Sequence, residues 1–96
     1  MQKISFAREM GFTREEFDRI LPAALNQRAF DRSTGGIKLP IDSGTMQLVI
    51  SEQKYRKIAS ISLPYLDIEF IFEGLSDAQV EATMRYFDLR YQRGGG

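Results

Sequence analysis

Two arginines followed by a serine, a threonine and two glycines are the clearest set of residues in this chain that could do chemistry. Consecutive glycines let backbone N–H groups converge on one point, and a guanidinium matches the geometry of a phosphate. The Walker pattern is absent, because no Gly-Lys-Ser/Thr occurs and no strand leads into the segment. The segment is therefore either a solvated connection or a loop that binds a small anion such as phosphate or a nucleotide. Its residues are Arg28, Arg32, Ser33, Thr34, Gly35 and Gly36.

Carboxylates that lie close in sequence form a second set. Asp67 and Glu69 would share a strand face, and Glu15, Glu16 and Asp18 cluster in an early helix. Such pairs can act as an acid pair or a weak site for a hard metal, although a solvated surface is the simpler interpretation. The chain contains no His and no Cys. Without the commonest general base and the common soft ligands, the composition disfavours an enzyme. We predict no catalytic residue, no metal site and no cofactor.

Cations alternate with aromatic side chains near the end of the chain, at Arg85, Tyr86, Arg90, Tyr91 and Arg93. This composition can stack bases or contact RNA. However, 13 basic residues balance 13 acidic ones. A zero net charge gives no long-range field that would attract nucleic acid or an anionic membrane. An RNA-contacting module therefore ranks last among the binding hypotheses.

The last residues, Arg93-Gly94-Gly95-Gly96, are the only part of the chain with a family resemblance. A terminal Gly-Gly is similar to the tails of ubiquitin-like sulfur carriers. In those carriers, which resemble a β-grasp, the tail leaves a strand, whereas here a predicted helix precedes it. The simpler interpretation is a glycine helix stop followed by a flexible tail over residues 94–96.

Length and composition indicate one globular domain over residues 1–96. The chain is 43% hydrophobic and 27% charged, which is ordinary for a domain that buries its own core. The N-terminal segment has no apolar run of signal-peptide length, and no segment approaches about 18 apolar residues. Together with the missing cysteines, this favours a cytoplasmic protein without a membrane-spanning segment.

Two helices are predicted from the same signal. Thr13 to Glu16 and Ser76 to Gln79 both fit a capping box. Pro22 should kink or break the first helix. In the second, Val80, Met84, Phe87 and Tyr91 form one apolar stripe that should be buried, and this helix should run to about Gln92.

Four strands are expected between the helices, over residues 37–42, 46–51, 55–62 and 67–73. Four-residue loops at 42–45 and at Leu63 to Leu66 would connect a meander, with its first strand at the edge because it contains Pro40. The fold class is thus α+β, a two-layer α-β-β-β-β-α sandwich with both helices on one face of a four-stranded antiparallel sheet. The predicted inner face comprises Ile37, Leu39, Ile41, Met46, Leu48, Ile50, Ala59, Ile61, Ile68, Phe70 and Phe72.

The outer face of that meander would align Val49, Ile58 and Ile71 in one row, with Lys38 at its end. Exposed β-branched residues suit strands and need no partner, but an aligned row can also be the centre of an interface. We therefore predict a non-catalytic protein-interaction module that self-associates, or binds another protein, through the outer sheet face or the edge strand. The alternatives are the small-anion loop at 28–36 and the RNA-contacting module.

Overall fold

The computed structural model describes residues 3–33 and 36–92 and shows an antiparallel sheet with two helices. The α+β class is therefore confirmed, but the sheet has six strands rather than four. The elements are β1 (Lys3–Met10), α1 (Arg14–Ala24), β2 (Asp31–Ser33), β3 (Gly36–Ile41), β4 (Gly44–Ile50), β5 (Lys54–Ile58), β6 (Ile61–Glu73) and α2 (Asp77–Arg90).

Both helices begin where the capping boxes predict. The Thr13 and Ser76 side chains accept the N–H of the residue three positions on, and Glu16 and Gln79 accept the N–H of the capping residue in return. Pro22 lies inside α1, and the helix continues to Ala24, so no break occurs there. No helix in the described part of the chain is long and apolar enough to cross a membrane.

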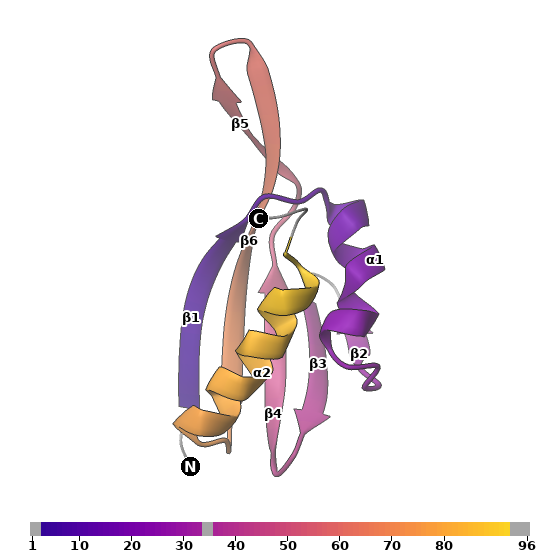
Figure 1. Ribbon diagram of the computed structural model, residues 1–96, viewed down its shortest axis with the longest axis vertical. Coiled ribbons are helices and arrows are strands. Elements are labelled where there is room, and N and C mark those ends of the chain that lie inside the picture. Colours follow the sequence, from indigo (N-terminus) through magenta and orange to yellow (C-terminus); the bar gives the residue numbers. More distant parts are fainter. Residues whose placement is uncertain (1–2, 34–35, 93–96) are drawn as a thin grey trace.

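The sheet runs in the order β1-β6-β4-β3-β2, with β5 paired only to the first part of β6. Figure 1 shows the consequence: β5 and the start of β6 form a hairpin that projects away from the other elements. With this hairpin included, the molecule measures 47 × 30 × 21 Å. We call this hairpin, residues 54–65, the arm, and we call the remaining strands with the two helices the body.

One face of the body's sheet supplies the core. Every predicted inner-face residue from Ile37 to Ile50 is buried, as are Ile68, Phe70 and Phe72. Ring contacts join the helices to this core: Phe87 of α2 meets Phe70 edge to face at 5.3 Å, and Phe17 of α1 stacks on Tyr91 at 5.0 Å. That both helices cover this face of the sheet stays a prediction.

The first hairpin is shifted by two residues from the predicted register. Leu39 pairs with Met46 and Ile37 pairs with Leu48, because the loop has two residues, Asp42 and Ser43, instead of four. Asp42 takes a positive φ of 50°, a conformation that Asp tolerates better than most residues. A shift by two leaves the buried face unchanged, since side chains alternate with period two.

The second half of the predicted meander is wrong. The chain turns at Ala59 and Ser60, so that Ile58 pairs with Ile61, and β6 runs straight through the segment expected to be a loop. Pro64 lies where β6 has a strand on one side only, and a missing N–H is tolerated there. Ala59 and Ile61, predicted to be inside, are exposed.

The strands β1 and β2 are absent from the predicted fold. Within β1, Ile4 and Phe6 are partly buried on the core face, but the next residue on that face is Arg8, which interrupts the apolar alternation. The Arg8 guanidinium lies over the Phe6 and Phe70 rings and pairs with Asp88 of α2. β2 pairs with residues 36–38, so β3 is not an edge strand there, contrary to the prediction.

Candidate functional site

The structure does not bring the predicted interface residues into one row. In the body, Ile71 lies opposite Gln47, which in turn lies opposite Lys38, whereas Val49 lies opposite Glu69. Ile58 is in the arm, paired with Ile61. Lys38, Ile71 and Val49 therefore remain neighbours on the outer face, while Ile58 lies beyond the end of that sheet.

The arm carries the largest concentration of exposed apolar side chains in the described part of the chain. Ile58, Ile61 and Leu63 are 53%, 58% and 45% exposed. In the observed register Ile58 faces Ile61 and Arg56 faces Leu63, so all of these side chains project from the same side of the arm. Tyr55, 63% exposed, pairs with Pro64 and projects from the opposite side.

The apolar side of the arm continues the outer face of the body. Leu63 and Ile71 are eight positions apart on the continuous strand β6, so their side chains lie on the same face. This face points outward, away from the core residues Phe70 and Phe72. Val49 of β4, 41% exposed, is also on this outer face, opposite Glu69.

Ion pairs fix the base of the arm on this outer face. Arg56 contacts Glu9 of β1 at 2.7 Å and lies over the Tyr65 ring at 4.8 Å, while Lys54 contacts Asp67 at 2.8 Å. Hydrogen bonds to these carboxylates raise the pKa of Lys54 and of Arg56, with direct charge attraction as a further cause. Lys54 and Arg56 therefore stay charged over a wider range of pH.

Gln53 joins the arm to the body through hydrogen bonds to three backbone groups. Its amide nitrogen donates to the carbonyl oxygens of Phe12 at 3.4 Å and Tyr65 at 3.2 Å, and its amide oxygen accepts the N–H of Arg14. One half-buried side chain thus connects the arm, the end of β1 and the start of α1. This holds the base of the arm in place while its end stays exposed.

The predicted anion loop is divided between different environments. Arg32 contacts Asp18 of α1 at 3.4 Å and lies over the Phe30 ring at 5.4 Å. Ser33 is exposed in β2, and Thr34 and Gly35 lie outside the described residues. Gly36 is buried in β3, and a Cβ there would lie 2.5 Å from the carbonyl oxygen of Leu48. Close packing of two strands thus accounts for this glycine.

Among the described residues of that set, Arg28 faces an open space. It lines a groove of about 370 Å³ between the segment after α1, the β3–β4 turn and α2. Sequence reasoning placed Arg28 in a loop and missed the groove, because the groove depends on the position of α2.

The residues suggested for RNA contact that the structure describes form contacts within the chain. The Tyr91 hydroxyl is buried and donates to the carbonyl oxygen of Phe17 at 2.7 Å, and burial raises its pKa. Arg85 pairs with Glu81, and Arg90 donates to the Tyr86 hydroxyl. Arg93 and the glycines that follow it lie outside the described residues.

Asp67 and Glu69 share the outer face of β6 as predicted, where Asp67 contacts Lys54 and Glu69 is exposed. Over residues 3–33 and 36–92, no group of three or more acidic side chains is arranged to hold a metal ion. Comparison of the chain with protein-family models, with curated proteins and with solved structures finds no match.

Proposed function

We propose that the protein is a non-catalytic interaction module that pairs with a second copy of itself through the outer face shared by the arm and the body. The observation that carries this proposal is the side of the arm formed by Ile58, Ile61 and Leu63, which is about half exposed. Each Å² of such surface removed from water contributes roughly 25 cal/mol, and contiguous exposed apolar patches mark interaction sites.

Charge favours an antiparallel arrangement of the two copies. On its apolar side the arm carries Lys54 and Arg56 and no carboxylate, whereas Lys57 pairs with Ser62 and projects from the opposite side. The outer face of the body carries Glu69 and Glu73, which are exposed and form no ion pair within the described residues. Stacking the outer faces in opposite directions brings Lys54 and Arg56 of one copy toward Glu69 and Glu73 of the other.

The same geometry accounts for the exposed apolar residues of the body. With a twofold axis near Asp67 of β6, Leu63 of one copy lies over Ile71 of the other, and Val49 borders that contact. A self-complementary interface of this kind is the commonest in soluble oligomers. The arm strands, about 17 Å long, are too short for a stable interface of roughly 800 Å² per copy, so the body must take part.

The test compares lysine substitutions on the two sides of the arm, with oligomeric state measured by sedimentation equilibrium. Ile58→Lys and Leu63→Lys place a charge on the apolar side, and each should weaken the dimer by at least about tenfold. Tyr55→Lys is the matched control, since it adds the same charge at an equally exposed position on the opposite side. It should leave the dimer unchanged.

Val49→Lys separates this arrangement from contact through the arms alone. If the arm of one copy covers the body of the other, this substitution in the body should also weaken the dimer. Circular dichroism on each variant excludes unfolding as the cause, because exposed substitutions usually change stability by less than about 0.5 kcal/mol. A wild-type protein that stays monomeric at every concentration would contradict the proposal, as would equal effects of Tyr55→Lys and Ile58→Lys.

A further inference from the structure

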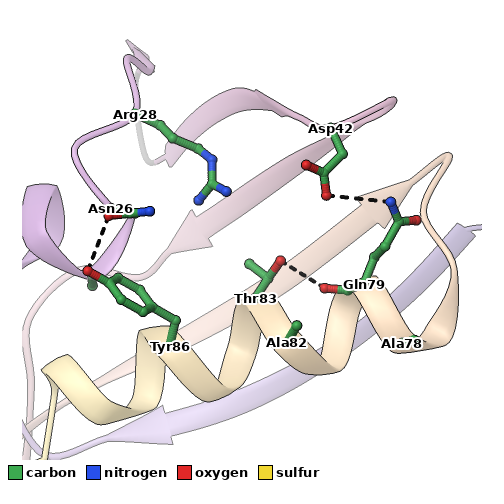
Figure 2. Close-up of a pocket in the computed structure, with 9 residues that line it drawn as sticks. Asn26, Arg28, Asp42, Ala78, Gln79, Ala82, Thr83 and Tyr86 are labelled. Atoms are coloured by element: carbon green, nitrogen blue, oxygen red, sulfur yellow. Dashed lines mark hydrogen bonds between the residues drawn. The ribbon is translucent and has the colours of Figure 1, made fainter.

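The groove beside α2 differs from the arm in having a polar rim and a small-residue floor. Ala78 and Ala82, four residues apart on α2, and Ala24 at the end of α1 leave the space open. Polar side chains reach it from three segments: Asn26 and Arg28 after α1, Asp42 in the β3–β4 turn, and Thr83 and Tyr86 on α2 (Figure 2). A concave site with a few convergent polar groups is the usual form of a small-molecule site.

The orientation of the Asn26 amide follows from a chain of hydrogen bonds. Arg90 donates to the Tyr86 hydroxyl oxygen at 3.0 Å, and that hydroxyl donates to the Asn26 amide oxygen at 3.2 Å. Because a guanidinium can only donate, the Tyr86 proton is free for Asn26, and the Asn26 amide oxygen accepts it. The amide nitrogen then points into the groove, on the same side as the Arg28 guanidinium (Figure 2).

Arg28 adds a second donor beside that amide. Its guanidinium is half-buried, and its one hydrogen bond among the described residues is a long one of 3.4 Å to the carbonyl oxygen of Leu25. It forms no ion pair within the described part of the chain. The Asn26 amide nitrogen and the Arg28 guanidinium can only donate, and both point into the same part of the groove, an arrangement that suits an oxyanion.

Asp42 gives the groove an acceptor at another point of its rim. Its carboxylate contacts the Gln79 amide nitrogen at 3.5 Å and, like Arg28, has no ion-pair partner among the described residues. Arg28 and Asp42 thus line one groove and yet remain apart. A ligand with an anionic group and a hydrogen-bond donor could bind both.

Local turns place two polar side chains at the groove. Asn26 follows the end of α1 and Asp42 lies in the β3–β4 turn, with φ angles of 56° and 50°. Asn and Asp adopt this left-handed conformation more readily than other residues. Both side chains lie at the groove (Figure 2).

We propose that this groove binds a small molecule that carries an oxyanion at one end and a hydrogen-bond donor at the other, with Arg28 and Asn26 holding the oxyanion and Asp42 the donor. The site is independent of the outer face, and it differs from the predicted 28–36 loop in using only Arg28 from that set. A carboxylate or a phosphate would meet the same two donors.

The experiment titrates the full chain with two matched pairs of probes, acetate with β-alanine and inorganic phosphate with phosphoethanolamine, and follows backbone amide resonances by NMR. In each pair the second probe adds an ammonium group. We expect resonances around residues 26–28, 42 and 79–86 to shift at millimolar concentration. The probe with the ammonium group should bind more tightly, and the stronger pair identifies the anion as carboxylate or phosphate.

Variants then assign the two ends of the groove. Arg28→Gln should weaken binding by about tenfold or more, since it removes a charge-assisted pair, whereas Arg19→Gln removes an exposed arginine of α1 and should change nothing. Asp42→Asn keeps a residue that tolerates positive φ and should abolish the advantage of the ammonium probes. No shift with any probe would overturn the proposal, as would an Arg28→Gln protein that binds as tightly as the wild type.

Discussion

The body and the arm share strand β6, and the apolar side chains change sides where one region meets the other. In the body, the even-numbered residues Leu66, Ile68, Phe70 and Phe72 are apolar and at most 1% exposed. In the arm, the odd-numbered residues Ile61, Leu63 and Tyr65 are apolar. Because a strand alternates its side chains, the apolar row of the arm faces away from the core.

This difference shows that apolar alternation in a strand indicates a face but does not indicate what covers it. The body's row is covered from within the chain, by the ring of Phe87 among others. Within the described residues, Ile61 and Leu63 of the arm have no such cover and are about half exposed, since β5 pairs with β6 edge to edge. The body should therefore determine the stability of the fold, and the arm should contribute to association.

The largest expected effect is the difference in stability between truncating an apolar residue of the body and truncating one of the arm. Phe87→Ala removes a ring in contact with Phe70 and Tyr91, and it should lower the free energy of unfolding by about 3–5 kcal/mol. Ile61→Ala in the arm should lower it by less than about 1 kcal/mol, because Ile61 is 58% exposed. Urea denaturation below the concentration of self-association measures both. Similar losses would show that the arm is part of the core.

A smaller effect should appear at alkaline pH, and it belongs to the body. Burial raises the pKa of Tyr91 above its ordinary value of 10.0, with the charge of Asp18 as a further cause. Above pH 10 the unfolded chain releases the Tyr91 proton while the folded chain retains it. The unfolded state then binds fewer protons, so the free energy of unfolding should fall as pH rises, by up to about 1.4 kcal/mol per pH unit.

Tyr91→Phe tests whether this residue is the source. The variant loses the hydrogen bond to the Phe17 carbonyl oxygen, so it should be less stable near neutral pH by about 1 kcal/mol. Its stability should then decline less steeply than that of the wild type between pH 10 and 11. Parallel pH profiles for the two proteins would assign the alkaline loss to other groups.

The helices and the core face were predictable from local signals. Capping boxes mark both helix starts, and the apolar stripe from Val80 to Tyr91 marks the buried side of α2. β1 was not predicted, because Arg8 occupies a core-facing position and its guanidinium covers aromatic rings there. Pro64 was interpreted as a turn, although its position in β6 has an open side where a missing N–H costs little.

The candidate sites were less predictable, because each depends on a register or a contact between distant elements. The two-residue turn at Ala59 and Ser60 has no glycine or asparagine to signal it, so Ile58 was assigned to the sheet. In the sequence of β6, the apolar residues shift from odd to even positions between Tyr65 and Leu66. This shift is the sequence feature that could have indicated the arm. The groove depends on Asp42 and α2 being brought together across the fold, and neither segment indicates the other.

The smallest expected effect concerns the turn of the arm and should sharpen the separation of the two regions. Ala59 takes a positive φ of 54° at the first position of a two-residue hairpin loop, where glycine is strongly preferred. Ala59→Gly removes a clash of Cβ with the backbone that costs roughly 1–2 kcal/mol. The greater entropy of glycine in the unfolded chain offsets about 0.4–1 kcal/mol of this gain, so the hairpin should be stabilised by about 1 kcal/mol or less. Because the arm can open without the body, hydrogen exchange should slow at amides of residues 54–65 and stay unchanged at core amides such as that of Phe70. Slower exchange throughout the chain would mean that arm and body unfold as one unit.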